Sequence, residues 1–380
     1  MINYSKQSID SKEIRAVSKV LKSDYLTQGP LVKKFEKEIS DYCNSKHAIA
    51  VNSATSGLHI ACMSLGVKKN DIVWTSAISF VASANAAAYC NADIDFLDIS
   101  LDDFNIDIQG LEKKLIIAKR KNKLPKVIIV VHFAGNPCQM KQIYSLKKKY
   151  KFKIIEDASH TLGAKYMNKP IGSCNFSDMC VFSFHPVKSI TTAEGGVVTT
   201  NNKKLFSDLK LYREHGINRD FINKKVRPKY YEQIILGYNY RMNELQAAIG
   251  IEQLKKLDSF ISKRVKIYNL YKSKLKNNLF KYPSISRNSN SSHHLFVIIL
   301  KKNIRKLRDN FFSKLLKKGI GVNIHYMPIY KHPFYKNYVK KNFLLKNAET
   351  YYNTCISIPI FPTLSKKQQS VVVKAINTLK

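Results

Sequence analysis

The stretch that decides the fold contains KIIEDASHTLGAKY (153–166) and CVFSFHPVKSITTAEGGVVTT (180–200). The first piece is a short apolar run that stops at Glu156-Asp157, and the second is an apolar run that ends in a turn carrying Lys188. In an open α/β sheet, ligands bind at the carboxyl ends of the strands. An acid at one strand end and a lysine just past another therefore indicate a site. Because neighbouring strand residues point to opposite faces, we expect Asp157 to face this site and Glu156 to have a structural role on the other face.

Taken one at a time, these residues are ambiguous. An aspartate at a strand end is most often a cap or turn former, and a lysine is most often a solvated surface charge. EDASH and SFHPVK become specific as a pattern together with GYNYR (237–241) and HYMPIY (325–330). The pattern resembles the DegT-type sugar aminotransferases, which use pyridoxal 5′-phosphate (PLP), and within that family the members of the pseudaminic acid pathway. The resemblance covers nearly the whole chain, from about residue 4 to residue 359.

The order of apolar segments predicts the fold class. Through residue 200, apolar runs alternate with helical patterns, which indicates a doubly wound α/β domain. The resemblance implies the PLP-dependent transferase fold of type I (aspartate aminotransferase-like), with a mostly parallel sheet. We expect a large PLP-binding α/β domain over residues 1–258 and a small C-terminal α+β domain over residues 259–380. Near this boundary, apolar residues at helical spacing predict one long helix over residues 242–257.

A candidate phosphate site lies at NSATSG (52–57), between a short strand and an apolar helix. Small hydroxyl residues at such a position commonly cap the helix. The same geometry also binds anions, because the first backbone N–H groups have no partner within the helix and the helix dipole favours negative charge. Gly57 permits close approach. We therefore expect the cofactor phosphate at Ala54 and Thr55.

The resemblance implies roles for the other cofactor residues. Lys188 would hold the cofactor and move the proton as general base and acid. Asp157 would keep the pyridine nitrogen protonated, since a nearby carboxylate raises the pKa of that nitrogen. Phe80 would contact the ring face, and Ser183 would contact the phosphate. His160, at a position where many relatives carry glutamine, would contact the ring's 3-oxygen. Asn239, in GYNYR, would reach the phosphate of the neighbouring subunit's cofactor, which implies a homodimer with a shared site.

The substrates follow from the same resemblance. It implies that L-glutamate donates an amino group to C4 of a UDP-linked 4-keto-6-deoxy-N-acetylhexosamine, namely UDP-4-keto-6-deoxy-N-acetyl-β-L-altrosamine. Without the resemblance, residues 25–30 read as a linker and residues 325–328 as an ordinary strand end. The residues implied to line the sugar-nucleotide pocket are Tyr4, Tyr25, Leu26, Thr27, His325, Tyr326, Met327 and Pro328.

Two other functions stay open. The first is an aminotransferase for a different nucleotide-linked 4-keto sugar, because ring configuration depends on a few pocket contacts. The second is a basic, non-catalytic binding or regulatory protein on the same fold, which would need no cofactor and would bind nucleic acid with a steep salt dependence. A sugar dehydratase is disfavoured, because relatives of that kind have a histidine in place of Lys188.

Composition narrows the partners and the compartment. The formal net charge is +37, but only 10 of the 64 basic residues are arginine, and the lysines are spread over the whole chain. This distribution favours anionic small substrates over nucleic acid. Seven cysteines without a CxxC pair predict reduced thiols, no metal site and a cytoplasmic protein. MINYSKQSID lacks a signal peptide's apolar run, and residues 72–92 are interrupted by polar side chains, so we expect no membrane segment.

Overall fold

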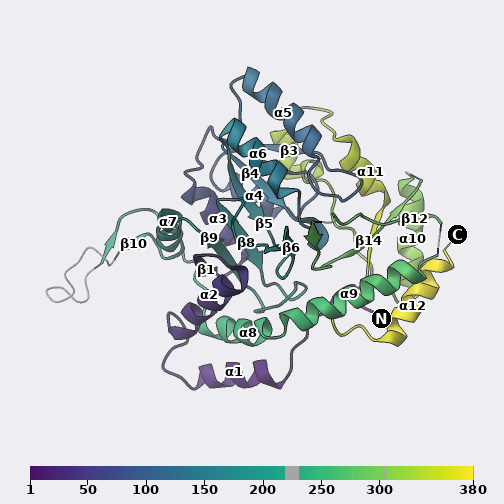
Figure 1. The fold of residues 1–380 in the computed structure, drawn as a ribbon, viewed down its shortest axis with the longest axis horizontal. Helices are drawn as coiled ribbons and strands as arrows, with labels where there is room; N and C mark the ends of the chain where they lie inside the picture. The colour runs from purple at the N-terminus through teal and green to yellow at the C-terminus, as the bar shows by residue number, and fades with distance from the viewer. Residues whose placement is uncertain (219–230, 277, 287, 303, 380) are drawn as a thin grey trace.

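A seven-stranded sheet forms the centre of the molecule (Figure 1). The computed structural model describes residues 1–218, 231–276, 278–286, 288–302 and 304–379. The sheet has the strand order β1-β9-β8-β5-β4-β2-β3, and β9 is antiparallel to both of its neighbours while the other pairs are parallel. The predicted mostly parallel α/β fold is confirmed. Its strands are β1 (His47–Val51), β2 (Ile72–Ser76), β3 (Asp93–Leu97), β4 (Val127–Val131), β5 (Lys153–Asp157), β8 (Met179–Ser183) and β9 (Gly196–Thr200).

Helices cover both faces of this sheet, because its strands are apolar on both sides. In β5, Ile155 packs into one hydrophobic cluster and Ile154 into the other. The first cluster includes side chains of α3 (Ala54–Ser64), α4 (Ala82–Ala88) and α7 (Lys203–Arg213). The second includes side chains of α2 (Pro30–Cys43), α5 (Ile108–Arg120), α6 (Met140–Tyr150) and α8 (Glu244–Leu254). The alternation places Asp157 on the side of α3 and α4, and Glu156 on the opposite side.

A third hydrophobic cluster lies in the C-terminal part of the chain, between residues 267 and 379. Its side chains come from α9 (Leu257–Lys274), β12 (Phe280–Lys281), β14 (Phe296–Leu300), α10 (Arg305–Lys317), β15 (Cys355–Ile358) and α12 (Lys366–Asn377). Buried side chains of α11 (Lys346–Thr354) pack in the first cluster instead. The N-terminal residues join this part: the amide of Gly321 donates to the carbonyl of Ile2, and the amide of Ile360 donates to the carbonyl of Tyr4. The domain division at residue 258 stays a prediction.

One predicted helix is wrong. The single helix expected over residues 242–257 is two helices, because α8 ends at Leu254 and α9 begins at Leu257. Between them, the Lys256 ammonium lies 2.7 Å from the Asp10 carboxylate and 2.6 Å from that of Glu13. These two acids form the capping box of α1 (Ser11–Leu21). The break coincides with these ion pairs to a distant helix start, which local spacing does not encode.

Short elements complete the described chain. They are η1 (Phe133–Gly135), β6 (Lys165–Tyr166), β7 (Lys169–Pro170), β10 (Ile217–Asn218), β11 (Glu232–Gln233), β13 (Ser289–Asn290), η2 (Ile329–Lys331) and η3 (Pro333–Tyr338). Over the described ranges, every helix falls short of the length and apolar character that crossing a bilayer requires.

Candidate active site

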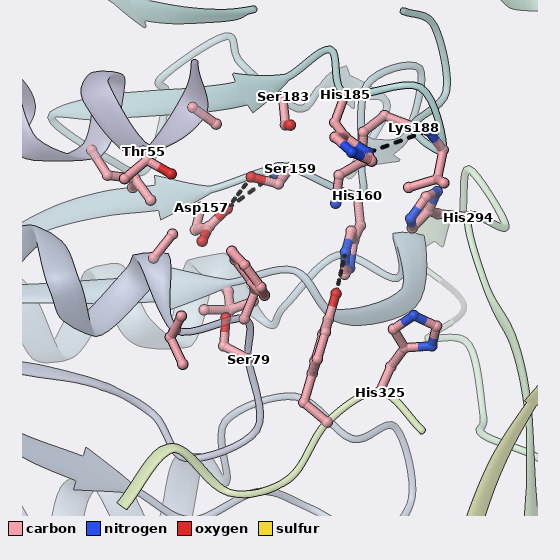
Figure 2. A pocket seen from close by; sticks show the side chains of 18 of the residues that line it. Thr55, Ser79, Asp157, Ser159, His160, Ser183, His185, Lys188, His294 and His325 are labelled. Atoms are coloured by element: carbon pink, nitrogen blue, oxygen red, sulfur yellow. Dashed lines mark hydrogen bonds between the residues drawn. The ribbon is translucent and has the colours of Figure 1, made fainter. Parts of the chain in front are cut away.

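A cavity of about 860 Å³ lies at the carboxyl edge of the parallel strands (Figure 2). Its volume is in the range of pockets that take cofactors and small ligands. One wall comes from the ends of β5 and β8 and the start of α3, and the facing wall comes from residues 323–327 and His294. The predicted residues that line it are Tyr4, Ala54, Thr55, Phe80, Asp157, His160, Ser183, Lys188, His325, Tyr326 and Met327.

Asp157 ends β5 and faces this cavity, as its alternation with Ile155 requires. Ser83 on α4 donates to its Oδ2 at 2.6 Å, and the hydroxyl of Ser159 donates to its Oδ1 at 2.6 Å. The amide of Ser159 also donates to Oδ1, at 3.2 Å. These donors fix the orientation of a carboxylate that is only 5% exposed. Figure 2 shows Asp157 and Ser159 side by side, with the dashed bonds between them.

Glu156 has the structural surroundings predicted for it. Its Oε2 lies 2.7 Å from Nε2 of the buried His132, and its Oε1 accepts a hydrogen bond from Ser177. Glu156 is absent from the cavity lining. The two adjacent acids therefore have separate surroundings on opposite sides of the sheet.

The start of α3 forms the anion-binding end of the cavity. Ser53 caps this helix by accepting from the amide of Ser56 at 3.1 Å. The amides of Ala54 and Thr55 are at the first helical positions, where no carbonyl of the same helix can reach them. Gly196 at the start of β9 lies so close that a Cβ there would be 2.7 Å from the amide nitrogen of Ala54. Ser183, at the end of β8, lines the same cavity.

Lys188 lies in the turn that follows β8. Its amide donates to the carbonyl of His185 at 2.9 Å, and the hydroxyl of Thr191 donates to the carbonyl of Phe184 at 3.0 Å, which holds the turn. Burial lowers the pKa of Lys188 to about 8, and the Asp157 carboxylate offsets part of that shift. The amine therefore exists in both protonation states near neutral pH, as an amine that both forms a covalent bond and carries a proton requires.

Two aromatic side chains and an imidazole form the middle of the cavity. The hydroxyl of Tyr326 and Nε2 of His160 are 3.3 Å apart. Phe80 is 58% exposed and lines the cavity, with its ring centroid 6.2 Å from that of Tyr326. A large apolar side chain at the mouth of a polar cavity offers a flat surface to a planar ligand.

The far wall contains Tyr4 and His325, whose ring centroids are 5.4 Å apart. The Nδ1 of His325 is 2.8 Å from the hydroxyl of Ser357, and its Nε2 is 3.3 Å from Nδ2 of Asn323. Because an amide nitrogen can only donate, Nε2 is the acceptor and Nδ1 carries the proton. Burial lowers the pKa of His325 to about 3, so the ring stays neutral.

Five predicted residues lie outside this cavity. Tyr25, Leu26 and Thr27 are exposed in the loop between α1 and α2, and Pro328 is buried behind the wall that Met327 lines. Asn239 is exposed and pairs with Glu214 in an isolated bridge. Their predicted roles stay predictions.

Several lining or supporting residues were missed by the sequence analysis. Ser159 follows Asp157 by two positions, a spacing typical of Asx turns, so a local signal existed. No local signal existed for the others, since sheet order and loop packing bring them to the cavity: Ser79, Ser83, Glu194, His294 and Asn323.

These residues fit PLP. The α3 amides suit its phosphate, and Asp157 suits its ring nitrogen. Two further observations agree with a ligand site here. The Nδ1 of His160 is buried without a hydrogen-bond partner in the described part of the chain. Among the described residues, no carboxylate lies within salt-bridge distance of Lys188.

Comparison with known proteins gives the same result. The model of the DegT/DnrJ/EryC1/StrS aminotransferase family matches residues 7–377. A UDP-4-amino-4,6-dideoxy-N-acetyl-beta-L-altrosamine transaminase of Campylobacter jejuni subsp. jejuni (serotype O:23/36, strain 81-176) is 42% identical over 374 residues, which cover 98% of this chain and 96% of the relative. A protein of the same name from Helicobacter pylori (strain ATCC 700392 / 26695) is 34% identical, covering 95% of this chain and 93% of the relative.

Solved structures agree with this relationship. PseC of Helicobacter pylori, an aminotransferase involved in the biosynthesis of pseudoaminic acid, is 33% identical with a TM-score of 0.90, covering 99% of this chain and 98% of that chain. The PLP form of Spr1654 from Streptococcus pneumoniae is 26% identical with a TM-score of 0.90, covering 100% of this chain and 98% of that chain. With a family match over residues 7–377, this protein belongs to the DegT/DnrJ/EryC1/StrS aminotransferase family, and its cofactor is PLP.

Proposed function

We propose that this protein transfers the amino group of L-glutamate to C4 of UDP-4-keto-6-deoxy-N-acetyl-β-L-altrosamine in pseudaminic acid biosynthesis. The observation that carries the proposal is the single cavity in which Lys188, Asp157, His160 and the start of α3 come together. The names of the Campylobacter and Helicobacter relatives supply the sugar. Overall, the amino group of glutamate and the carbonyl oxygen of the sugar exchange places, so the products are 2-oxoglutarate and the 4-amino sugar.

The residues have distinct tasks in this reaction. When bound, PLP supplies the electron sink that lets an amino group move between two carbon atoms. The amine of Lys188 holds the cofactor and, once released, moves a proton to and from the reacting carbons at its Nζ. Its lowered pKa of about 8 suits both directions of that transfer. Asp157, oriented by Ser83 and Ser159, holds the proton on the ring nitrogen.

The remaining side chains bind and orient. The amides of Ala54 and Thr55, with the Ser183 hydroxyl, hold the phosphate. Phe80 would cover the ring face, and His160 would lie by the 3-oxygen. Tyr4 and the segment 325–328 contact the sugar nucleotide, which the Lys-rich chain attracts through its net charge of +37.

We infer further that the active unit is a homodimer. Tyr25 is 56% exposed, Leu26 is 50% exposed and Leu236 is 74% exposed, and such apolar exposure commonly marks an interface. Leu236 lies three positions before Asn239. In the dimer, Asn239 of one subunit reaches the cofactor phosphate of the other, and residues 25–27 border the nucleotide-sugar pocket.

The absorbance spectrum of the purified protein tests the cofactor assignment. We expect a band of lysine-bound PLP that shifts when L-glutamate is added. Product analysis with the altro- and gluco-configured UDP-4-keto sugars then tests the substrate. Faster conversion of the gluco sugar would favour an aminotransferase for a different nucleotide-linked 4-keto sugar. The absence of a band after incubation with PLP would contradict the whole proposal.

A further inference from the structure

The segment 291–295 places one residue, His294, in the cavity wall. The amide of Ser292 donates to the carbonyl of Gly135 at 3.0 Å, and the amide of Leu295 donates to the carbonyl of Ala134 at 3.2 Å. The Ser292 hydroxyl donates to the carbonyl of His160 at 2.7 Å. A Cβ on Gly135 would lie 2.5 Å from that hydroxyl, so only glycine permits this approach. The segment is therefore fixed directly to the residue that lies by the cofactor ring.

A buried arginine holds the same segment from the other side. Arg264 on α9 is 1% exposed and donates to the carbonyls of His294 at 3.1 Å and Ile360 at 2.8 Å. Burial lowers its pKa to about 10. Among the described residues it has no carboxylate partner within salt-bridge distance, so these carbonyls are what compensate its charge. Moving the backbone of His294 would remove that compensation.

The imidazole of His294 lies flat on that of His160. Their centroids are 4.4 Å apart with an angle of 28° between the planes. His160 is 6% exposed and His294 is 2% exposed, and Nδ1 of each lacks a hydrogen-bond partner in the described part of the chain. Figure 2 shows the rings of His160 and His294 in the cavity, and the hydroxyl of Tyr326 lies 3.3 Å from Nε2 of His160. The His160 ring is thus held on one face by His294 and at one nitrogen by Tyr326.

The hydrogen bond with Tyr326 is compatible with a tautomer of His160 in which Nδ1 carries the proton. Burial raises the pKa of the Tyr326 hydroxyl, which therefore keeps its proton and can donate it to Nε2 of His160. The proton of a neutral His160 ring is then on Nδ1. The ring is neutral because burial, followed by the charge of Lys188, lowers the pKa of His160. The result is one unpartnered N–H in the cavity wall.

We propose that His294 is a positioning residue for His160: its stacked ring fixes the plane of that imidazole and excludes water from it, so that the Nδ1–H is held ready for an acceptor on the cofactor. This inference rests on the proposed function of the cavity. It assigns a role to His294, a residue that does not itself contact the reacting atoms.

Three variants test the proposal. His294→Ala removes the ring, and His294→Phe restores a flat ring without nitrogen atoms. His293→Asn is the matched control, because His293 is the adjacent buried histidine, yet its ring packs on Tyr268 with centroids 4.1 Å apart. Its φ of 49° is one that asparagine tolerates.

The first measurement is histidine NMR of the protein before PLP is added, with His160→Gln to assign the signals. We expect a neutral Nδ1–H tautomer in the unsubstituted protein. In His294→Ala, water reaches the ring, so the pKa of His160 rises toward its ordinary value of about 6.5. His294→Phe and His293→Asn should keep the neutral tautomer.

The second measurement is kcat and KM of the PLP-loaded enzyme. Misplacing a contact group costs roughly tenfold or more in turnover, so His294→Ala should lose about tenfold in kcat while its PLP absorbance band still forms. His294→Phe should recover most of that loss, and His293→Asn should lower only the melting temperature. Unchanged titration and kcat in His294→Ala, or the same losses in His293→Asn, would overturn the inference. Failure of the unsubstituted protein to bind PLP would instead contradict the proposed function, which the NMR measurement does not depend on.

Discussion

The cavity residues Asp157 and Lys188 and the exposed residues 25–27 and Asn239 differ in whether a single chain surrounds them with partners. Asp157 and Lys188 have their hydrogen bonds and charge partners within the same chain. Tyr25, Leu26 and Asn239 are assigned to the site by the same family resemblance, but they are exposed and lie outside the cavity. The difference teaches that a predicted site residue can lie away from the cavity of its own chain, which is what our proposal of a shared site requires. Four predictions test this distinction.

Substitution of Lys188 should have the largest effect. Lys188→Ala removes both the covalent attachment and the proton carrier, so we expect kcat to fall by at least about 10³-fold with the fold intact. Circular dichroism measures whether the fold is intact, and kcat after PLP supplementation measures the loss of turnover. Lys19→Ala, on the exposed side of α1, is the control and should behave as the unsubstituted protein. Appreciable turnover by a clean Lys188→Ala preparation would contradict the assignment.

Asp157→Asn should lower kcat by roughly 10²-fold, because the neutral amide keeps the shape but no longer stabilises charge on the ring nitrogen. Steady-state kinetics at saturating PLP separate this loss from weaker cofactor binding. The adjacent Glu156→Gln is the matched control: it removes a charge beside His132, on the opposite side of the sheet. We expect it to change stability and to leave kcat nearly unchanged. An equal kcat loss in both variants would mean that the two faces are not functionally separate.

The capture of PLP should depend on pH through Lys188. A protonated amine has no lone pair to attach the cofactor, and the pKa of Lys188 is lowered to about 8. The capture rate should therefore fall about tenfold per pH unit below that value and level off above it. Stopped-flow absorbance of the cofactor-free protein mixed with PLP gives the profile. A midpoint close to the ordinary lysine pKa of about 10.4 would show that burial does not act on this amine.

Asn239→Ala should have the smallest effect, about a tenfold loss of PLP affinity, because one hydrogen bond to a charged group contributes about 1.5–3 kcal/mol. The sharper test co-expresses Lys188→Ala and Asn239→Ala chains. If Asn239 serves the neighbouring subunit, the mixed dimer has one site with both native residues and regains activity at limiting PLP. Each variant expressed alone is the control. If isolated mixed dimers do not regain activity, Asn239 serves the site of its own subunit or does not serve either site.

The sequence predicted the parts of the site that depend on local order. Strand alternation separated Asp157 from Glu156, and the helix start at Ala54 and Thr55 followed from capping chemistry, because both signals lie within a few residues. The long helix over 242–257 was wrong for the converse reason. Its break coincides with ion pairs between Lys256 and acids about 245 positions earlier in the chain.

By itself, the sequence determined the fold class and the family pattern, and it pointed to Lys188 and Asp157, on which we propose that the chemistry rests, since these are encoded in short contiguous motifs. Only the tertiary structure brought Ser83 to Asp157 across 74 positions of chain, and His294 onto His160. Such contacts depend on which strands become neighbours and on how closely a glycine such as Gly135 lets two segments approach. Those are properties of the packed sheet and its loops, and no local stretch of sequence contains them.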